Sequence, residues 1–175
     1  MGPTAIEGVP GVRGWLLRTL VNRQNPAGGV YGTVIVGALL AAESEHALSI
    51  WRDTGAILVA VSMFWLAHAY ANGMGERIAQ RQPFTLKSFG HSLLREWAVL
   101  SGAIIPLIAT LVAYGLGASL VDALLWGMYV AAATLIAYEV VAGLEVGARG
   151  LVLLRQAVAG AVLGAMILLL HSVLA

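Results

Sequence analysis

Three polar side chains close an apolar stretch in the first half of the chain. The stretch is uncharged from Ile57, and His68, Tyr70 and Asn72 then place an imidazole, a phenol and a carboxamide near its end. Ionisable residues are rare inside membrane helices and often have a function there. Such groups could relay a proton, bind a lipid headgroup or hold helices together.

Further polar residues are predicted at the same depth in other apolar segments. The candidate polar cluster comprises His68, Tyr70, Asn72, Glu96, Glu139 and Gln156. A carboxylate beside the imidazole would favour its charged form, and we hypothesise that His68 contacts Glu139. The alternative is a structural hydrogen bond between helices, which contributes about 0.6 kcal/mol on average.

The sequence lacks the signatures of common catalytic sites. It contains no HExxH, GxSxG or P-loop motif and no cysteine, and its four histidines lack metal-ligand spacing. His91 fits a basic helix face, and His171 is expected near a membrane interface. We therefore expect no catalytic residue, metal or cofactor, and we expect that the protein is not an enzyme.

Composition indicates an integral membrane protein. Hydrophobic residues make up 59% of the 175 residues and charged residues 11%, and the mean hydropathy is +0.85. Soluble proteins contain about 25% charged residues. A bilayer core takes about 20 residues per helix, so five or six spans fit. The net charge of +1 gives no reason to expect nucleic acid as a partner.

Five apolar segments are predicted to cross a membrane, and the first of them is short. They cover residues 30–42, 54–73, 97–114, 120–141 and 151–174. The sequence therefore predicts an all-α integral membrane protein, with a bundle of five transmembrane helices in residues 30–175 preceded by a cytoplasmic arm, residues 1–29.

Small residues and a proline predict how these spans pack. Gly32 and Gly37 would let a neighbouring backbone approach the first span, and Gly160 with Gly164 forms a small-xxx-small pair in the fifth. Pro106 is expected to kink the third span and to free a carbonyl one turn earlier.

Two amphipathic interfacial helices are also expected. One covers residues 12–22 and ends before Pro26–Gly29, which is predicted to break the helix. The other covers residues 84–97, where apolar residues recur every three or four positions and Thr85 can cap the start. The basic residues expected to contact anionic lipid headgroups are Arg13, Arg18, Lys87, His91 and Arg95. A solvated arm and an ordinary soluble loop helix are the alternatives.

Charge alternation predicts the orientation. Basic residues gather before the first span, between the second and third, and around the start of the fifth, whereas Arg52 lies in an acidic connection. Because cytoplasmic loops are enriched in Lys and Arg, this pattern predicts a multi-pass protein of the inner (plasma) membrane with its N-terminus inside and its C-terminus outside.

Several segments together resemble a family of small multi-pass actinobacterial membrane proteins without assigned activity. The resemblance rests on Val30–Thr33, Trp65–Ala71, Arg95–Trp97 with Pro106, and Tyr138-Glu139 with Gly143, and it extends from about residue 29 onward. It supports the fold and the choice of His68, Glu96 and Glu139. Other members place an acid after the position of Ala71, whereas this chain has Asn72, which weakens a proton-relay interpretation.

Two classes of function remain open. Size and span count are similar to accessory subunits that dock on Mce-type lipid importers, which implies a non-catalytic accessory or stabilising subunit of a larger membrane complex. The alternative is a small homo-oligomeric transporter or channel with a polar site in the cytoplasmic leaflet. The expected partners are anionic lipid and either a larger membrane protein or a second copy of the chain.

Overall fold

The computed structural model describes residues 26–174, and all regular secondary structure in this range is helical. The elements in order are α2 (Pro26–Ser44), α3 (Ile50–Gln80), α4 (Leu86–Arg95), α5 (Trp97–Gly115), α6 (Leu120–Glu145) and α7 (Leu151–Leu174). Five segments are long and apolar enough to cross a membrane, with α4 and α5 forming one of them together. The predicted all-α, five-span fold is thus confirmed by length and composition. The predicted helix over residues 12–22, with Arg13 and Arg18, lies outside the described residues.

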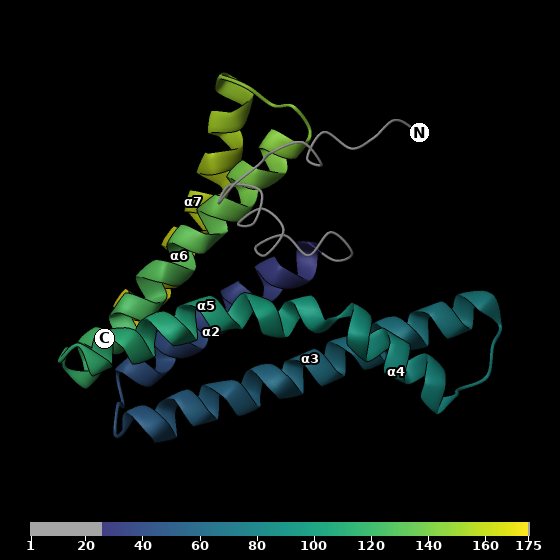
Figure 1. Cartoon of the computed structure of the whole chain (residues 1–175), viewed down its shortest axis with the longest axis horizontal. Coiled ribbons are helices and arrows are strands. Elements are labelled where there is room, and N and C mark those ends of the chain that lie inside the picture. The colour runs from purple at the N-terminus through teal and green to yellow at the C-terminus, as the bar shows by residue number, and fades with distance from the viewer. Residues whose placement is uncertain (1–25, 175) are drawn as a thin grey trace.

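The helices form two arms that diverge from a common end (Figure 1). Helices α3, α4 and α5 make one arm and α6 with α7 makes the other, while α2 packs against α5, α6 and α7. The arms meet where the connections 45–49 and 116–119 and the end of α7 lie together. We call this the Glu45 end. The opposite end, where α2 begins, is called the Pro26 end.

Helix α2 begins earlier than predicted. The expected helix break at residues 26–29 is wrong, because these residues form the first turn of α2. Proline is favoured at the first position of a helix, where its missing N–H would have no partner anyway. The glycines that follow serve packing: a Cβ built on Gly29 would lie 2.9 Å from the hydroxyl oxygen of Tyr138 in α6.

Helices α2 and α5 cross with their backbones in contact. A Cβ built on Gly32 would lie 1.9 Å from the carbonyl oxygen of Val99, and one built on Gly102 would lie 2.2 Å from the carbonyl oxygen of Gly29. Glycine on both helices is therefore what permits the crossing. The close approach expected at the first span is present, and the sequence had not indicated Gly102 as its counterpart.

A hydroxyl from α2 satisfies the carbonyl that Pro106 leaves free. Helix α5 runs through Pro106, which has no N–H for the carbonyl of Gly102 four residues earlier. The Oγ1 of Thr33 lies 3.0 Å from that carbonyl oxygen and 2.9 Å from the carbonyl oxygen of Gly29. The predicted free carbonyl thus receives its hydrogen bond across the α2–α5 crossing. Thr33 is fully buried, which makes this bond part of the core.

The core toward the Glu45 end is apolar and tightly closed. Six side chains from three helices are no more than 1% exposed there: Val36, Leu40, Ile57, Val61, Leu124 and Met128. Helix α7 joins α6 through the predicted small pair, because a Cβ on Gly164 would meet Ala132 at 2.8 Å and one on Gly160 would meet the backbone of Ile136 at 2.8 Å. Small residues thus set the spacing of the second arm.

Helix α4 folds back on the final turns of α3. The hydroxyl of Thr85 accepts a hydrogen bond from the backbone N–H of Ser88 at 3.1 Å, which confirms the predicted cap. On the apolar face, the indole N–H of Trp65 in α3 donates to the carbonyl of Leu93 at 3.2 Å, and the Phe89 ring lies 6.4 Å from that of Tyr70. Part of this face therefore packs on the protein itself. Its position relative to a membrane stays a prediction.

Candidate functional site

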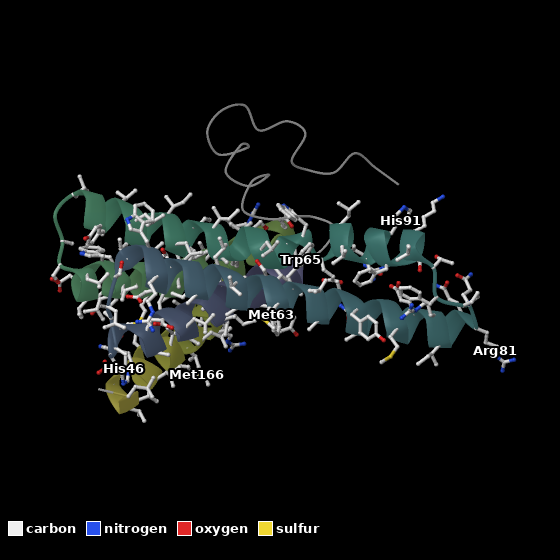
Figure 2. The ribbon with its side chains drawn as sticks, turned by 90° about the horizontal axis from the view of Figure 1, so that it is seen from below. His46, Met63, Trp65, Arg81, His91 and Met166 are labelled. Atoms are coloured by element: carbon white, nitrogen blue, oxygen red, sulfur yellow. The ribbon has the colours of Figure 1, made fainter. Side chains whose placement is uncertain are left out.

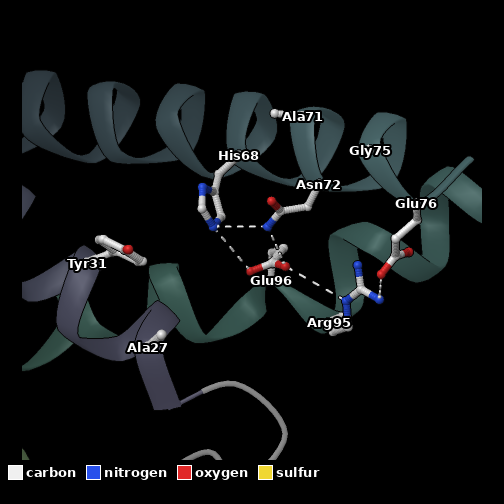
Figure 3. Close-up of a pocket in the computed structure, with 9 residues that line it drawn as sticks. All are labelled: Ala27, Tyr31, His68, Ala71, Asn72, Gly75, Glu76, Arg95 and Glu96. Carbon is white, nitrogen blue, oxygen red and sulfur yellow. Dashed lines mark hydrogen bonds and ion pairs between the residues drawn. The ribbon is translucent and has the colours of Figure 1, made fainter. Parts of the chain in front are cut away.

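A polar cavity of about 600 Å³ lies where α2, α3 and the α4–α5 junction meet at the Pro26 end (Figure 3). Helix α3 contributes most of the residues that line the cavity, and α2 contributes two. One further lining residue comes from the end of α4 and one from the α4–α5 junction. The lining residues are Ala27, Tyr31, His68, Ala71, Asn72, Gly75, Glu76, Arg95 and Glu96. Three predicted cluster residues, His68, Asn72 and Glu96, are brought together here.

Glu96 is the centre of the site. It separates α4 from α5, and its side chain is only 5% exposed. Its Oε1 accepts a hydrogen bond from the Asn72 amide at 2.9 Å, and its Oε2 lies 3.6 Å from Nε2 of His68. A buried carboxylate is stable only when it is paired and hydrogen-bonded, and these two side chains of α3 supply partners.

His68 and Asn72 are four residues apart, so they lie on the same face of α3. The Asn72 Nδ2 lies 3.1 Å from Nε2 of His68, and the same amide nitrogen reaches Glu96. A neutral imidazole with its proton on Nδ1 accepts from Asn72 through Nε2. A protonated imidazole instead directs its Nε2–H toward Glu96. The Nε2 of His68 therefore lies within hydrogen-bond distance of Asn72 and at ion-pair distance from Glu96.

Two aromatic rings flank the imidazole. The Phe64 ring is stacked on His68 with centroids 5.7 Å apart, and the Tyr31 ring of α2 lies 5.6 Å from it at a tilt. These contacts restrict the imidazole to the side of α3 that faces the cavity. Tyr31 belongs to the site by position, although no polar-residue pattern in the sequence indicated it.

Arg95 lies at the rim of the cavity. Its guanidinium pairs with Glu76 at 2.5 Å, and its Nε is 3.8 Å from Oε1 of Glu96. It was expected on the lipid-headgroup face of the amphipathic helix with Lys87 and His91, but it turns toward α3 because two carboxylates lie there. Lys87 and His91 are exposed, and Figure 2 shows His91 pointing away from the helices.

The other members of the predicted cluster lie elsewhere. Tyr70 is on another face of α3, with the Arg77 guanidinium 5.9 Å from its ring centroid. Glu139 is in α6 and partly buried, and the ion pair that His68 makes is with Glu96 rather than with this residue. The predicted depth included both Glu96 and Glu139 in the candidate cluster, but it could not choose between two acids predicted at a similar level.

Gln156 of α7 packs against α6. A Cβ built on Gly143 would lie 1.8 Å from its Oε1, so only glycine leaves room for the amide. This oxygen is buried and has no hydrogen-bond partner within the described residues. Gln156 thus belongs to the α6–α7 contact and not to the cavity, and an unpaired buried amide oxygen carries a desolvation cost.

A second set of polar contacts ties the Glu45 end together. The His171 Nδ1 at the end of α7 lies 3.1 Å from the Ser44 hydroxyl and 3.2 Å from Oε1 of Glu45. The buried Asp53 accepts the backbone N–H groups of Leu48 and Ser49 at 3.0 and 3.2 Å and so closes the turn before α3. His171 was expected at an interface, and its partners, Ser44 of α2 and Glu45 of the following connection, were not foreseen.

Within residues 26–174, no group of three or more His, Cys, Asp or Glu side chains is arranged to hold a metal ion. Comparison of the chain with protein-family models, with curated proteins and with solved structures finds no match. The features of the described residues that bear on its role are therefore the helices and the cavity. The cavity offers a buried carboxylate, an imidazole, an amide and a guanidinium, which are groups suited to binding a charged or hydrogen-bonding ligand.

Proposed function

We propose that the protein is a non-catalytic accessory or stabilising subunit of a larger membrane complex, of the kind that docks on a lipid importer. We place it in the inner (plasma) membrane with its N-terminus and the polar cavity on the cytoplasmic side. Of the ten Lys and Arg residues, only Arg52 belongs to a segment assigned to the outside. Such an excess of basic residues on one side supports this orientation.

The observation that carries the proposal is that the charged side chains of the cavity do not continue into the core beside it. Glu96 is bonded to Asn72 and close to His68, and Arg95 is paired with Glu76. Beyond them, toward the Glu45 end, the core is filled by apolar side chains that are at most 1% exposed. A substrate pathway needs polar groups along its whole length, and the buried hydroxyls of Thr33 and Thr110 in this core are bonded to helix carbonyls.

Helix α3 is the face that we assign to the partner protein. The apolar part of α3 is largely uncovered by the rest of the protein, as is that of α7. Its outward surface includes Ala56, Met63 and Ala67, all exposed, and a Cβ on Gly55 would meet nothing within 4 Å. Figure 2 shows Met63 on this surface. Small residues let a second helix approach closely, and α3 extends beyond the apolar core to carry the α3–α4 hairpin.

Purification in a mild detergent, followed by mass spectrometry of the co-purifying chains, tests the proposal. We expect one larger membrane protein in fixed stoichiometry. Ala67→Phe should release it by placing a bulky ring on the α3 face. Ala161→Phe, at an exposed position of α7, is the matched control and should retain it. If the wild-type protein and both variants each purify without any other chain, the subunit proposal is contradicted.

A homo-oligomeric transporter is the second candidate, and the cavity is the observation that favours it. A volume of about 600 Å³ with charged walls is the size of a small-molecule site. Since the core of one chain is closed, the remaining path would have to run between copies. A homogeneous oligomer of this chain in the same purification, with substrate-dependent flux in vesicles, would support this function over the first.

A further inference from the structure

We propose that the cavity binds the ethanolamine headgroup of a phospholipid, which is a primary ammonium joined to a phosphate. This inference concerns the cavity itself and does not depend on the α3 partner. It also differs from the contact with anionic lipid expected for the basic helix faces, because the cavity carries groups of both signs: Glu76, Glu96 and Arg95.

The cavity lies at the level where lipid headgroups are expected. Helix α2 begins at Pro26 and α5 begins at Trp97, so two apolar helices start beside it. The rings of Trp65 and Trp97 meet edge to face with centroids 6.0 Å apart on the same part of α3 and α5. Tryptophan is enriched at membrane interfaces, where its ring is apolar and its N–H can be satisfied. A ligand that enters here is therefore either a headgroup or a soluble molecule of similar chemistry.

The charge balance of the whole cavity favours a cation. Two carboxylates, Glu76 and Glu96, and one guanidinium, Arg95, line it, which leaves one excess negative charge when His68 is neutral. Glu96 is the deepest of the three, with 5% of its side chain exposed, compared with 48% for Glu76 and 40% for Arg95. A carboxylate has about four acceptor positions, and Glu96 lines the cavity together with His68 and Asn72.

The type of cation follows from the acceptors. A primary ammonium has three N–H donors, and the lining residues Glu96, Asn72 and Tyr31 each carry an oxygen acceptor. A trimethylammonium group has no donor and is held by several aromatic faces around it. Here only the rings of Tyr31 and His68 line the cavity. The site should therefore prefer ethanolamine to choline.

The rim suits the phosphate. The Arg95–Glu76 pair is exposed, and exposed pairs contribute little, so the guanidinium can turn its remaining N–H groups to a phosphate. Ala71 and Gly75 form the neighbouring wall, and the space beside Gly75 is open. The ammonium would thus lie deep against Glu96 while the phosphate lies at Arg95.

Native mass spectrometry of the purified protein tests the proposal. The protein is first exchanged into mixtures of phosphatidylethanolamine, phosphatidylcholine and phosphatidylglycerol with matched acyl chains. We expect one retained phosphatidylethanolamine per chain. Glu96→Gln should weaken this retention about tenfold, the loss typical of one hydrogen bond to a charged group. Glu139→Gln changes an acid that does not line the cavity and should leave retention unchanged. Equal retention of all three lipids, or a preference for phosphatidylglycerol, overturns the proposal.

A second pair of variants keeps the test valid if Glu96→Gln does not fold. Gly75→Phe fills the open wall of the cavity, and Gly55→Phe places the same ring at an open position near the other end of α3. Only the first should abolish retention of phosphatidylethanolamine. Soluble O-phosphoethanolamine should compete if the site recognises the headgroup alone. Unchanged retention in Gly75→Phe contradicts binding in this cavity.

Discussion

Replacing Gly32 with alanine should separate the two helices that cross at the centre of the fold. The new Cβ would lie 1.9 Å from the carbonyl oxygen of Val99, whereas ordinary contact begins at 3.4 Å. A gap of about 1.5 Å must therefore open. The obstructing atom belongs to the backbone and cannot rotate away, so α2 must move away from α5.

The expected cost follows from three contributions. Overpacking of a close contact costs about 1–3 kcal/mol, while alanine gains about 0.5–1 kcal/mol over glycine inside a helix. Movement of α2 also lengthens the bond from Thr33 to the Gly102 carbonyl, now 3.0 Å, and loses about 1 kcal/mol. We expect Gly32→Ala to lower the free energy of unfolding by about 2 kcal/mol.

Gly55→Ala is the matched control, because nothing lies within 4 Å of a Cβ at that helical position. It should raise the free energy of unfolding by about 0.5–1 kcal/mol. The two variants can be compared by titrating the protein from a mild detergent into a denaturing one and following its helical signal. If Gly32→Ala is as stable as Gly55→Ala, the backbone contact at the crossing does not exist.

The remaining predictions concern buried polar groups. Thr33→Val should lower the free energy of unfolding by about 1–3 kcal/mol, because the Gly102 carbonyl loses its donor. Thr134→Val should cost less, because the Thr134 hydroxyl bonds within its own helix. Equal losses in the same titration would argue against the cross-helix bond. Gln156→Met should raise the unfolding free energy by about 1 kcal/mol by removing an unpaired buried oxygen, and a loss of stability would show that the amide has a partner. Trp65→Phe removes the indole donor to the Leu93 carbonyl of α4. It should increase amide hydrogen exchange in α4 and leave exchange in α6 unchanged. Unchanged exchange in α4 would refute the contact.

Position along a membrane helix was predictable from the sequence, whereas rotation about its axis was not. Apolar length placed the spans, and the missing N–H of Pro106 indicated a free carbonyl in the preceding turn. The partner of that carbonyl, Thr33, could not be inferred, because an isolated threonine in a span usually bonds to its own helix. The same limit explains why Glu96, and not Glu139, is the neighbour of His68: both acids were predicted at one level, and only the packing of α3 on the α4–α5 junction distinguishes them.

Helix ends were predicted less well than spans, for local reasons. Proline followed by glycines usually interrupts a helix, but at Pro26 the position is a helix start and the glycines receive backbone and ring contacts from α5 and α6. Helix α3 continues to Gln80, past the predicted end at residue 73, because α4 folds back on its last turns and covers Gly73: a Cβ there would lie 2.8 Å from the Ser92 hydroxyl. Tertiary contacts thus outweighed local glycine signals at both places.

Both proposals require the polar cavity to lie at the cytoplasmic end of a membrane bundle, and labelling of single cysteines measures this directly. The natural chain has no cysteine, so Gly75→Cys in the cavity wall and Leu116→Cys in the exposed α5–α6 connection each give one reactive site. In intact cells, a membrane-impermeant maleimide should label position 116 and should label position 75 only after the membrane is permeabilised. Labelling of position 75 from outside, with position 116 protected, would contradict the orientation and the cytoplasmic cavity.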